Sequence, residues 1–139
     1  ISDAVNTASR MEGLSSIYGG NILISGAVLQ DIVNAEKYHI RYVDTVMVKG
    51  KEKAVKVYEV LDGLRAEQFD LKQATDQTFQ DGILSYREKS FESALKLFSE
   101  VSKQNPEDKA AALYVERCSQ ILKEGTPDDW EVIQRLTTK

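Results

Sequence analysis

Apolar and polar positions between Ile1 and Tyr18 repeat at helical spacing, which predicts an amphipathic helix from about Asp3. The apolar stripe consists of Ala4, Ala8, Met11, Leu14 and Tyr18. Asn6 and Arg10 lie one turn apart on another face of this helix. An amide and a guanidinium held side by side can bind an anionic group. The alternative is that both are ordinary solvated residues of a polar face.

Shorter patterns follow up to Val60, and their order predicts an α+β fold of helix, strand, helix, strand and strand with an antiparallel closing hairpin. The expected strands are residues 21–25, 38–48 and 54–60. A short amphipathic helix over residues 25–33 is expected to bury Val28, Leu29, Ile32 and Val33. The Lys49-Gly50-Lys51 sequence predicts the turn of the hairpin.

After Asp62-Gly63 the β signals end and helical periodicity takes over. The predicted helices are residues 71–86, 91–103, 108–122 and 128–136. Residues 64–70 are charged and fit either a linker or a helix start. We therefore expect one domain over residues 1–62, a linker over 63–70 and an all-α domain over 71–139.

The helical half resembles a tetratricopeptide repeat, because a small, an aromatic and a terminating residue recur at that repeat's spacing. The matching residues are Gly82, Ala94, Phe98 and Pro106. Thr78 departs from the pattern, because a Trp is common at its position in the repeat. A plain helical hairpin with core aromatics is the alternative. Trp130 is expected to be a packing anchor near the end of the chain.

Composition narrows the function further. The chain has 139 residues, 42% of them hydrophobic and 29% charged, with a net charge of −4, which argues against a nucleic-acid partner. No apolar run reaches the roughly 20 residues of a membrane span. The single cysteine, Cys118, fits a reducing, cytoplasmic compartment. The single histidine, His39, argues against His-rich metal sites and is expected to be an ordinary strand residue.

Several motifs in residues 1–61 resemble the class III nucleotidyl cyclases. The first helix reads D-A-V-N-T-A-S-R-M-E, which is similar to that family's signature. Y-G-G-N-I-L-I-S resembles the family's next strand, and V-K-G-K followed by V-K-V-Y-E-V resembles its closing hairpin. The resemblance implies the C-terminal half of a ferredoxin-like nucleotidyl cyclase domain, followed by the tetratricopeptide-like helices.

The family makes a 3′,5′-cyclic nucleotide and pyrophosphate from a nucleoside triphosphate, here expected to be ATP, in intracellular signalling. The resemblance implies that Asn6 orients the ribose, Arg10 contacts the α-phosphate region and Lys49 reaches the terminal phosphates. Two departures, Ser2 for a Gly and Ala54 for a Pro, affect none of these three.

The family's site lies at a dimer interface and uses magnesium or manganese, with the two metal-binding aspartates upstream of the signature helix. We therefore expect this chain to be part of a longer protein, to hold no metal ion and to be inactive alone. A homodimer or strand-paired partner chain is expected, as is a protein partner on the helical tail.

Two other interpretations remain. In one, the chain is a non-catalytic scaffold that binds a partner through its tetratricopeptide-like helices. In the other, it has an unrelated ferredoxin-like fold, and the three motif matches arise by chance.

Overall fold

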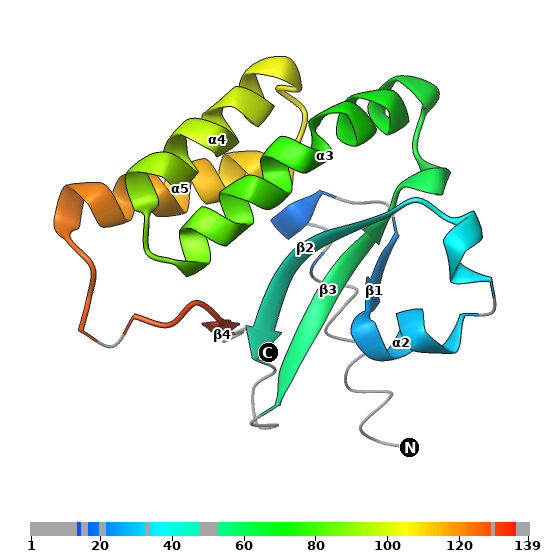
Figure 1. The fold of residues 1–139 in the computed structure, drawn as a ribbon, viewed down its shortest axis with the longest axis horizontal. Helices are drawn as coiled ribbons and strands as arrows, with labels where there is room; N and C mark the ends of the chain where they lie inside the picture. The colour runs from blue at the N-terminus through cyan, green and yellow to red at the C-terminus, as the bar shows by residue number, and fades with distance from the viewer. Residues whose placement is uncertain are drawn as a thin grey trace. The chain divides into compact units, whose positions relative to one another are not determined.

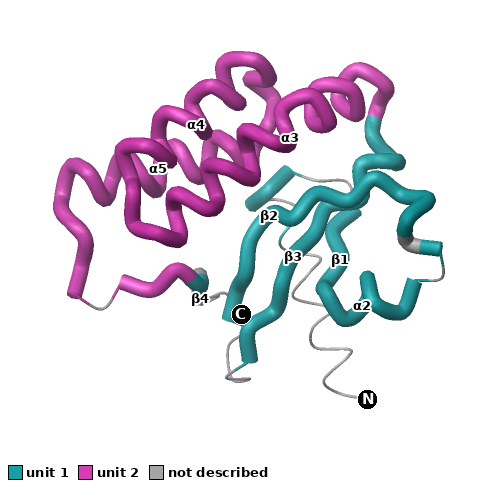
Figure 2. Tube along the Cα trace, in the orientation of Figure 1, with its two compact units in different colours: residues 1–64, 133–139 teal, residues 65–132 magenta. Residues whose placement is uncertain are grey.

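The computed structural model describes Leu14 and residues 17–19, 22–32, 34–47, 53–128 and 130–135. The fold is mixed α+β, with a small sheet and helices (Figure 1), as the hydrophobic pattern predicts. Two compact units divide the chain (Figure 2). One comprises residues 1–64 and 133–139, and the other comprises residues 65–132.

A sheet with the strand order β1-β3-β2-β4 organises the first unit. Its strands are β1 (Leu23–Ser25), β2 (Ile40–Met47), β3 (Ala54–Val60) and β4 (Gln134–Arg135). β3 pairs antiparallel with both β1 and β2, whereas β4 runs parallel to β2. The predicted antiparallel hairpin is therefore present, and its two strands form the centre of the sheet.

The short helix α2 (Gly26–Asp31) follows β1 directly. Ser25 caps it, because its hydroxyl accepts a hydrogen bond from the backbone N–H of Val28 at 3.2 Å. The expectation of a buried apolar face on this helix is wrong for Val28, whose side chain is 49% exposed. No residue of α2 is fully buried, because a helix of six residues presents less than two turns to the sheet.

The connection that ends the first unit is pinned by a side chain. After β3 the chain forms a 3-10 turn, η2 (Leu61–Gly63). Asp62 in this turn accepts a hydrogen bond from the backbone N–H of His39 at 2.7 Å, and its second oxygen lies 3.3 Å from Nδ1 of His39. The backbone hydrogen bond from His39 is the main reason why the pKa of Asp62 lies below its ordinary 3.8. His39 itself precedes β2 and is exposed.

Three helices form the second unit: α3 (Ala66–Arg87), α4 (Phe91–Gln104) and α5 (Lys109–Glu124). Residues 66–70 are helical, so α3 begins earlier than the apolar periodicity predicts. Asp108 caps α5 by accepting a hydrogen bond from the backbone N–H of Ala111. Gly125 follows α5 with a φ of 86°, a conformation that favours glycine.

Aromatic rings fill the space between these helices. Phe98 stacks on Tyr114 with 4.5 Å between ring centroids, and Phe79 meets both rings edge-on. Gly82 lies against the same cluster, because a Cβ built on it would stand 2.9 Å from Cζ of Phe98. The small and aromatic residues noted in the sequence therefore meet in the core. Membership of the tetratricopeptide family stays a prediction.

The end of the second unit is held by Trp130. Its ring lies edge-on to Tyr86 at 5.5 Å and to Phe91 at 5.2 Å, which confirms its expected role as a packing anchor. The helix predicted over residues 128–136 is wrong, because residues 130–133 are irregular and residues 134–135 form β4. The backbone of residues 134 and 135 pairs with β2 and so forms strand hydrogen bonds in place of the predicted helical ones.

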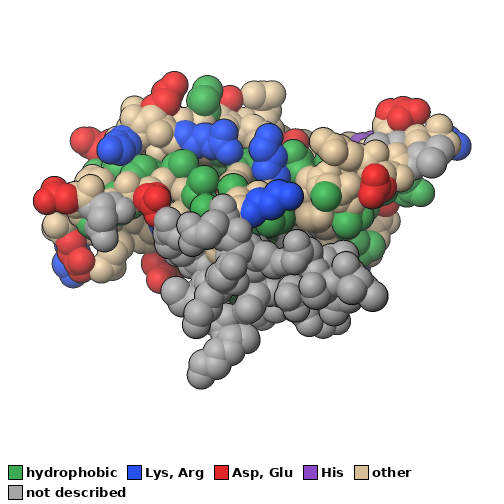
Figure 3. Space-filling view, turned by 90° about the horizontal axis from the view of Figure 1, so that it is seen from below, with side chains coloured by type: hydrophobic (Ala, Val, Ile, Leu, Met, Phe, Trp, Pro, Cys, Tyr) green, Lys and Arg blue, Asp and Glu red, His purple; other side chains and the backbone are tan. Residues whose placement is uncertain are grey.

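The described surface carries charges of both signs beside apolar side chains, as the face in Figure 3 shows. None of the described helices combines the length and the apolar character needed to cross a bilayer.

Replacing Gly82 by alanine should destabilise the second unit. In an exposed helix this substitution would stabilise by roughly 1 kcal/mol. Here the added methyl group would overlap the packed Phe98 ring, which costs about 1–3 kcal/mol. We expect a net loss of about 1 kcal/mol in urea unfolding followed by circular dichroism. Gly26→Ala is the control, because its Cβ would meet only ordinary contacts at 3.6 Å. A stabilising Gly82→Ala would contradict the packing described.

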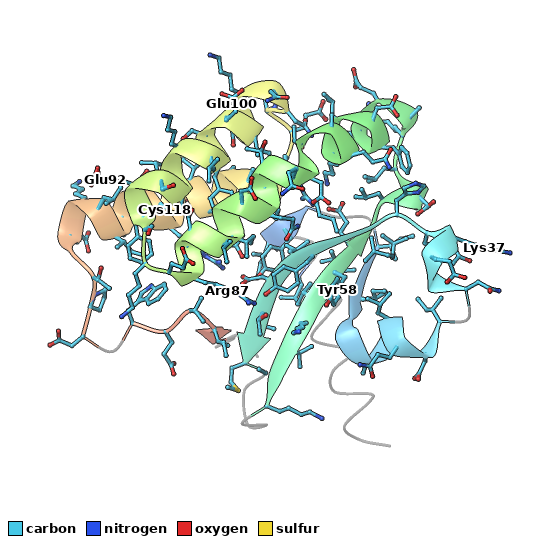
Figure 4. The ribbon with its side chains drawn as sticks, viewed as in Figure 1. Lys37, Tyr58, Arg87, Glu92, Glu100 and Cys118 are labelled. Carbon is cyan, nitrogen blue, oxygen red and sulfur yellow. The ribbon has the colours of Figure 1, made fainter. Side chains whose placement is uncertain are left out.

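Cys118, on α5 (Figure 4), should resist thiol reagents in the folded chain. It is fully buried, and burial raises the pKa of its thiol from 9.0 to about 11. At pH 8 the thiolate fraction is therefore about a hundredfold lower than in an exposed cysteine. Labelling by a disulfide reagent should become fast only in denaturing urea. Rapid labelling of the native chain would show that α5 does not shield this thiol.

Candidate functional site

The three residues that the sequence analysis assigns to a nucleotide site are Asn6, Arg10 and Lys49, and all three lie outside the described residues. Their roles stay predictions. The described residues nevertheless include Leu14 and Tyr18, at the end of the helix predicted to carry Asn6 and Arg10, and both strands of the hairpin on either side of Lys49. The site is therefore built here from the structure that supports it.

The first helix is anchored by its C-terminal end. Leu14 and Tyr18 are helical, lie one turn apart and are buried. Both belong to the apolar stripe predicted from the sequence. Gly19 follows with a φ of 77°, the left-handed conformation in which helices commonly end. The end of the helix is therefore fixed by the two side chains whose spacing predicted it.

The hairpin is fixed in register up to its turn. Cα partners run from Ile40 opposite Val60 to Met47 opposite Ala54, with one irregularity between Tyr42 and Asp44. Residues 48–52, which include Lys49, join these two ends and lie outside the described residues. The register sets the point at which the chain leaves β2 and returns into β3.

A buried hydrogen bond joins the helix end to β2. The Tyr18 hydroxyl donates to Oδ2 of Asp44 at 2.6 Å. The other carboxylate oxygen accepts from the backbone N–H of Thr45 at 2.8 Å. Tyr18 is 1% exposed and Asp44 is 4% exposed. Both oxygens of a carboxylate removed from water are thus hydrogen-bonded, which such burial requires.

An ion pair lies in the same sheet. Nη2 of Arg41 is 3.2 Å from Oε1 of Glu59, and the two side chains are 0% and 1% exposed. The residues are direct cross-strand partners on β2 and β3. A buried ion is tolerated only when a partner of opposite charge compensates its lost hydration. The two charges therefore specify each other's position.

A β-bulge brings the ion pair and Asp44 to one face. Val57 and Glu59 lie two residues apart on β3 and so share a face. Their partners on β2 are Asp44 and Arg41, which would point to opposite faces of a regular strand. The bulge leaves Val43 as the extra residue and restores the alternation. The carboxylate that Tyr18 contacts and the ion pair consequently lie on the same side of the sheet.

The opposite face carries tyrosines. Tyr42 and Tyr58, cross-strand partners, lie edge-on with 5.5 Å between ring centroids. The hydroxyls of Tyr42 and Thr45 are hydrogen-bonded to each other. Figure 4 shows Tyr58 on β3. Each face of the hairpin thus has a polar contact of its own, and the one that Asp44 makes joins β2 to Tyr18.

Sequence reasoning missed Arg41, Asp44 and Glu59. It also placed Tyr18 in the apolar stripe without expecting a role for its hydroxyl. The available signal was the presence of charged residues inside strands that are otherwise apolar. That signal is ambiguous, because a charge in a strand normally faces solvent, and the bulge that turns Asp44 inward leaves no mark in the sequence.

The part of the chain that the structure describes contains no cluster of metal-ligating side chains. Among those residues, no three His, Cys, Asp or Glu side chains gather in a group that could hold a metal ion.

Comparison with known proteins relates the chain to adenylate cyclases. It is 39% identical over 124 residues, 88% of its length, to "Adenylate cyclase, terminal-differentiation specific" of Dictyostelium discoideum. It is 49% identical over 61 residues to an adenylate cyclase of Anabaena cylindrica and 41% identical over 64 residues to adenylate cyclase 1 of Rhizobium meliloti. Neither a protein-family model nor a solved structure matches the chain significantly.

The matches cover a small part of each relative, and one of them extends over both compact units of this chain. The chain spans only 6%, 12% and 9% of the lengths of the three proteins. The match to the Dictyostelium protein is longer than either compact unit, so it includes residues of both. The relationship to adenylate cyclases therefore extends into the helical unit.

Breaking the Arg41–Glu59 pair should unfold the first unit far more readily than breaking a surface pair. Glu59→Gln would remove the negative charge 3.2 Å from the buried Arg41 guanidinium, at a cost of about 3–5 kcal/mol. Arg65 and Glu107 provide a matched control, since their Nη2 and Oε1 atoms are also 3.2 Å apart but both side chains are exposed. Glu107→Gln should cost about 0–1 kcal/mol. Equal losses in chemical denaturation would contradict the burial described.

Proposed function

We propose that the chain is the C-terminal part of a class III nucleotidyl cyclase catalytic domain, followed by a tetratricopeptide-like helical segment. The observation that carries this proposal is the match to the Dictyostelium adenylate cyclase over 88% of the chain. The signature read in residues 3–12 supports it. ATP is the proposed substrate, because the three relatives are all named adenylate cyclase.

The proposed reaction displaces pyrophosphate from the α-phosphate of ATP by the ribose 3′-oxygen. Negative charge builds up on the phosphates as the bond to the leaving group breaks, so fixed positive groups lower the barrier. Arg10 would contact the α-phosphate region and Lys49 the terminal phosphates. Asn6 would orient the ribose so that its 3′-oxygen lies in line with the leaving group.

The rest of the site would come from outside this chain. Magnesium or manganese, held by aspartates of a partner protomer, would stabilise charge on the phosphates. We therefore propose a homodimer or strand-paired assembly and expect no cyclase activity from this chain alone. The strand-paired assembly is supported by β1, which is an edge strand of the described sheet and has β3 as its neighbour. Edge strands can pair with a strand of another chain. A reducing cytoplasm is the proposed compartment for Cys118.

A regulatory or docking role is proposed for the helical unit. Its core is built from aromatic contacts among α3, α4 and α5, and Trp130 extends that core to the end of the unit. A packed helical unit of this kind is suited to binding a protein partner. If the hypothesis of a catalytic function fails, the alternative function is a scaffold that binds a partner through these helices.

The test is a cyclase assay with manganese and ATP on the complete protein and on this chain. We expect activity only from the complete protein, with Arg10→Ala lowering kcat about a hundredfold or more. Lys49→Ala should chiefly raise the KM for ATP. Arg65→Ala and Lys53→Ala are the controls, since both remove an exposed positive charge, and Lys53 lies on the same hairpin.

Two results would contradict the proposal. Strong activity from this chain alone would show that it needs no metal ligands from elsewhere. A folded, complete protein without activity would remove the cyclase function and leave the scaffold.

A further inference from the structure

Among the residues that the structure describes, a buried polar contact joins Tyr18 to the hairpin. Tyr18 and Asp44 are separated by 26 positions in the sequence and meet in a buried hydrogen bond of 2.6 Å. Burial of apolar side chains such as Leu14 stabilises a helix, but it is not directional. A short hydrogen bond between buried groups prefers one geometry and therefore fixes rotation and axial position as well.

Asp44 is itself held rigidly. Its Oδ1 accepts the backbone N–H of Thr45, the next residue of the strand, so the carboxylate is tied to the backbone of β2. The bulge at Val43 turns Asp44 toward the face that it shares with Arg41. The carboxylate that accepts from the Tyr18 hydroxyl is thus held in place by the backbone of β2.

The two residues lie on the two segments that carry the proposed nucleotide contacts. Tyr18 is helical and follows Arg10 by eight positions in the sequence, in the segment that the sequence pattern predicts to be one helix. Asp44 lies on β2, which ends at Met47 just before Lys49. One hydrogen bond therefore joins the segment with the proposed ribose and α-phosphate contacts to the strand that leads to the proposed terminal-phosphate contact.

We propose that Asp44 is a positioning residue, which acts through the Tyr18 hydroxyl to set the helix predicted to bear Asn6 and Arg10 against the hairpin that leads to Lys49. This inference rests on the proposed cyclase function. Cyclisation requires the ribose 3′-oxygen and the α-phosphate to be aligned, and a displacement of about 1 Å can cost up to a hundredfold in rate. Loss of the hydrogen bond consequently lowers turnover more than it lowers nucleotide affinity.

The experiment compares Tyr18→Phe with Tyr42→Phe in the complete protein, with manganese and ATP. Both substitutions remove one phenolic hydroxyl that is hydrogen-bonded within the same sheet, but the Tyr42 hydroxyl bonds Thr45 on the other face. We expect Tyr18→Phe to lower kcat about tenfold or more with KM changed less than about threefold. Tyr42→Phe should leave kcat within about twofold of the unmodified protein.

A second variant separates positioning from charge. In Asp44→Asn the amide oxygen can still accept from Thr45, and the amide nitrogen can donate to the Tyr18 oxygen. This variant should keep most of the turnover that Tyr18→Phe loses. The combination Tyr18→Phe with Asp44→Ala should lose little more than Asp44→Ala alone, because that change already removes the hydrogen bond to Tyr18 as well as the one from Thr45. Equal kcat in Tyr18→Phe and Tyr42→Phe, or fully additive losses, would overturn the proposal.

Hydrogen exchange distinguishes failure of this inference from failure of the cyclase function. Backbone amides of residues 1–18 should exchange faster in Tyr18→Phe than in Tyr42→Phe, at equal thermal midpoints. This readout needs no activity. An inactive complete protein would remove the proposed function, while unchanged exchange in Tyr18→Phe would remove the anchoring role of the hydrogen bond.

Discussion

The buried ion pair between Arg41 and Glu59 constrains the pairing of the two central strands of the first unit. A buried charge is costly unless an opposite charge compensates it, and these two charges are cross-strand partners in the observed register of β2 and β3. A slip of one residue would separate the charges and turn Val57 away from the buried face. The register in turn decides which residues are left to form the hairpin turn, and Lys49 is among them.

The hydrogen bond between Tyr18 and Asp44 extends this constraint from the sheet to the first helix. It depends on the bulge at Val43, without which Asp44 would face the opposite side. The chain thus has a sheet with a fixed register, a hairpin whose turn follows from it and a helix held by a directional contact. Preorganisation of this kind is what a site that stabilises charge on phosphates needs.

Much of the fold could be predicted from the sequence, because periodicity reports burial. The order of elements, the hairpin and the packing of Gly82 against Phe98 all follow from such patterns. The strand β4 could not be predicted, because its pairing with β2 comes from residues far apart in the sequence. Of the candidate site, family-like motifs supplied Asn6, Arg10 and Lys49. The supporting roles of Arg41, Asp44 and Glu59 depend on register and a bulge, which a single sequence does not display.

The most direct test of the central claim, that the first unit carries one phosphate-binding site, is an NMR titration of the isotope-labelled chain with pyrophosphate. The account predicts that amide shifts gather at Asn6, Arg10 and Lys49 and at the adjoining ends of β2 and β3, while α3 to α5 stay unchanged. It also predicts that Arg10→Ala removes these shifts. Shifts confined to the helical unit, or none at millimolar pyrophosphate, would contradict the account.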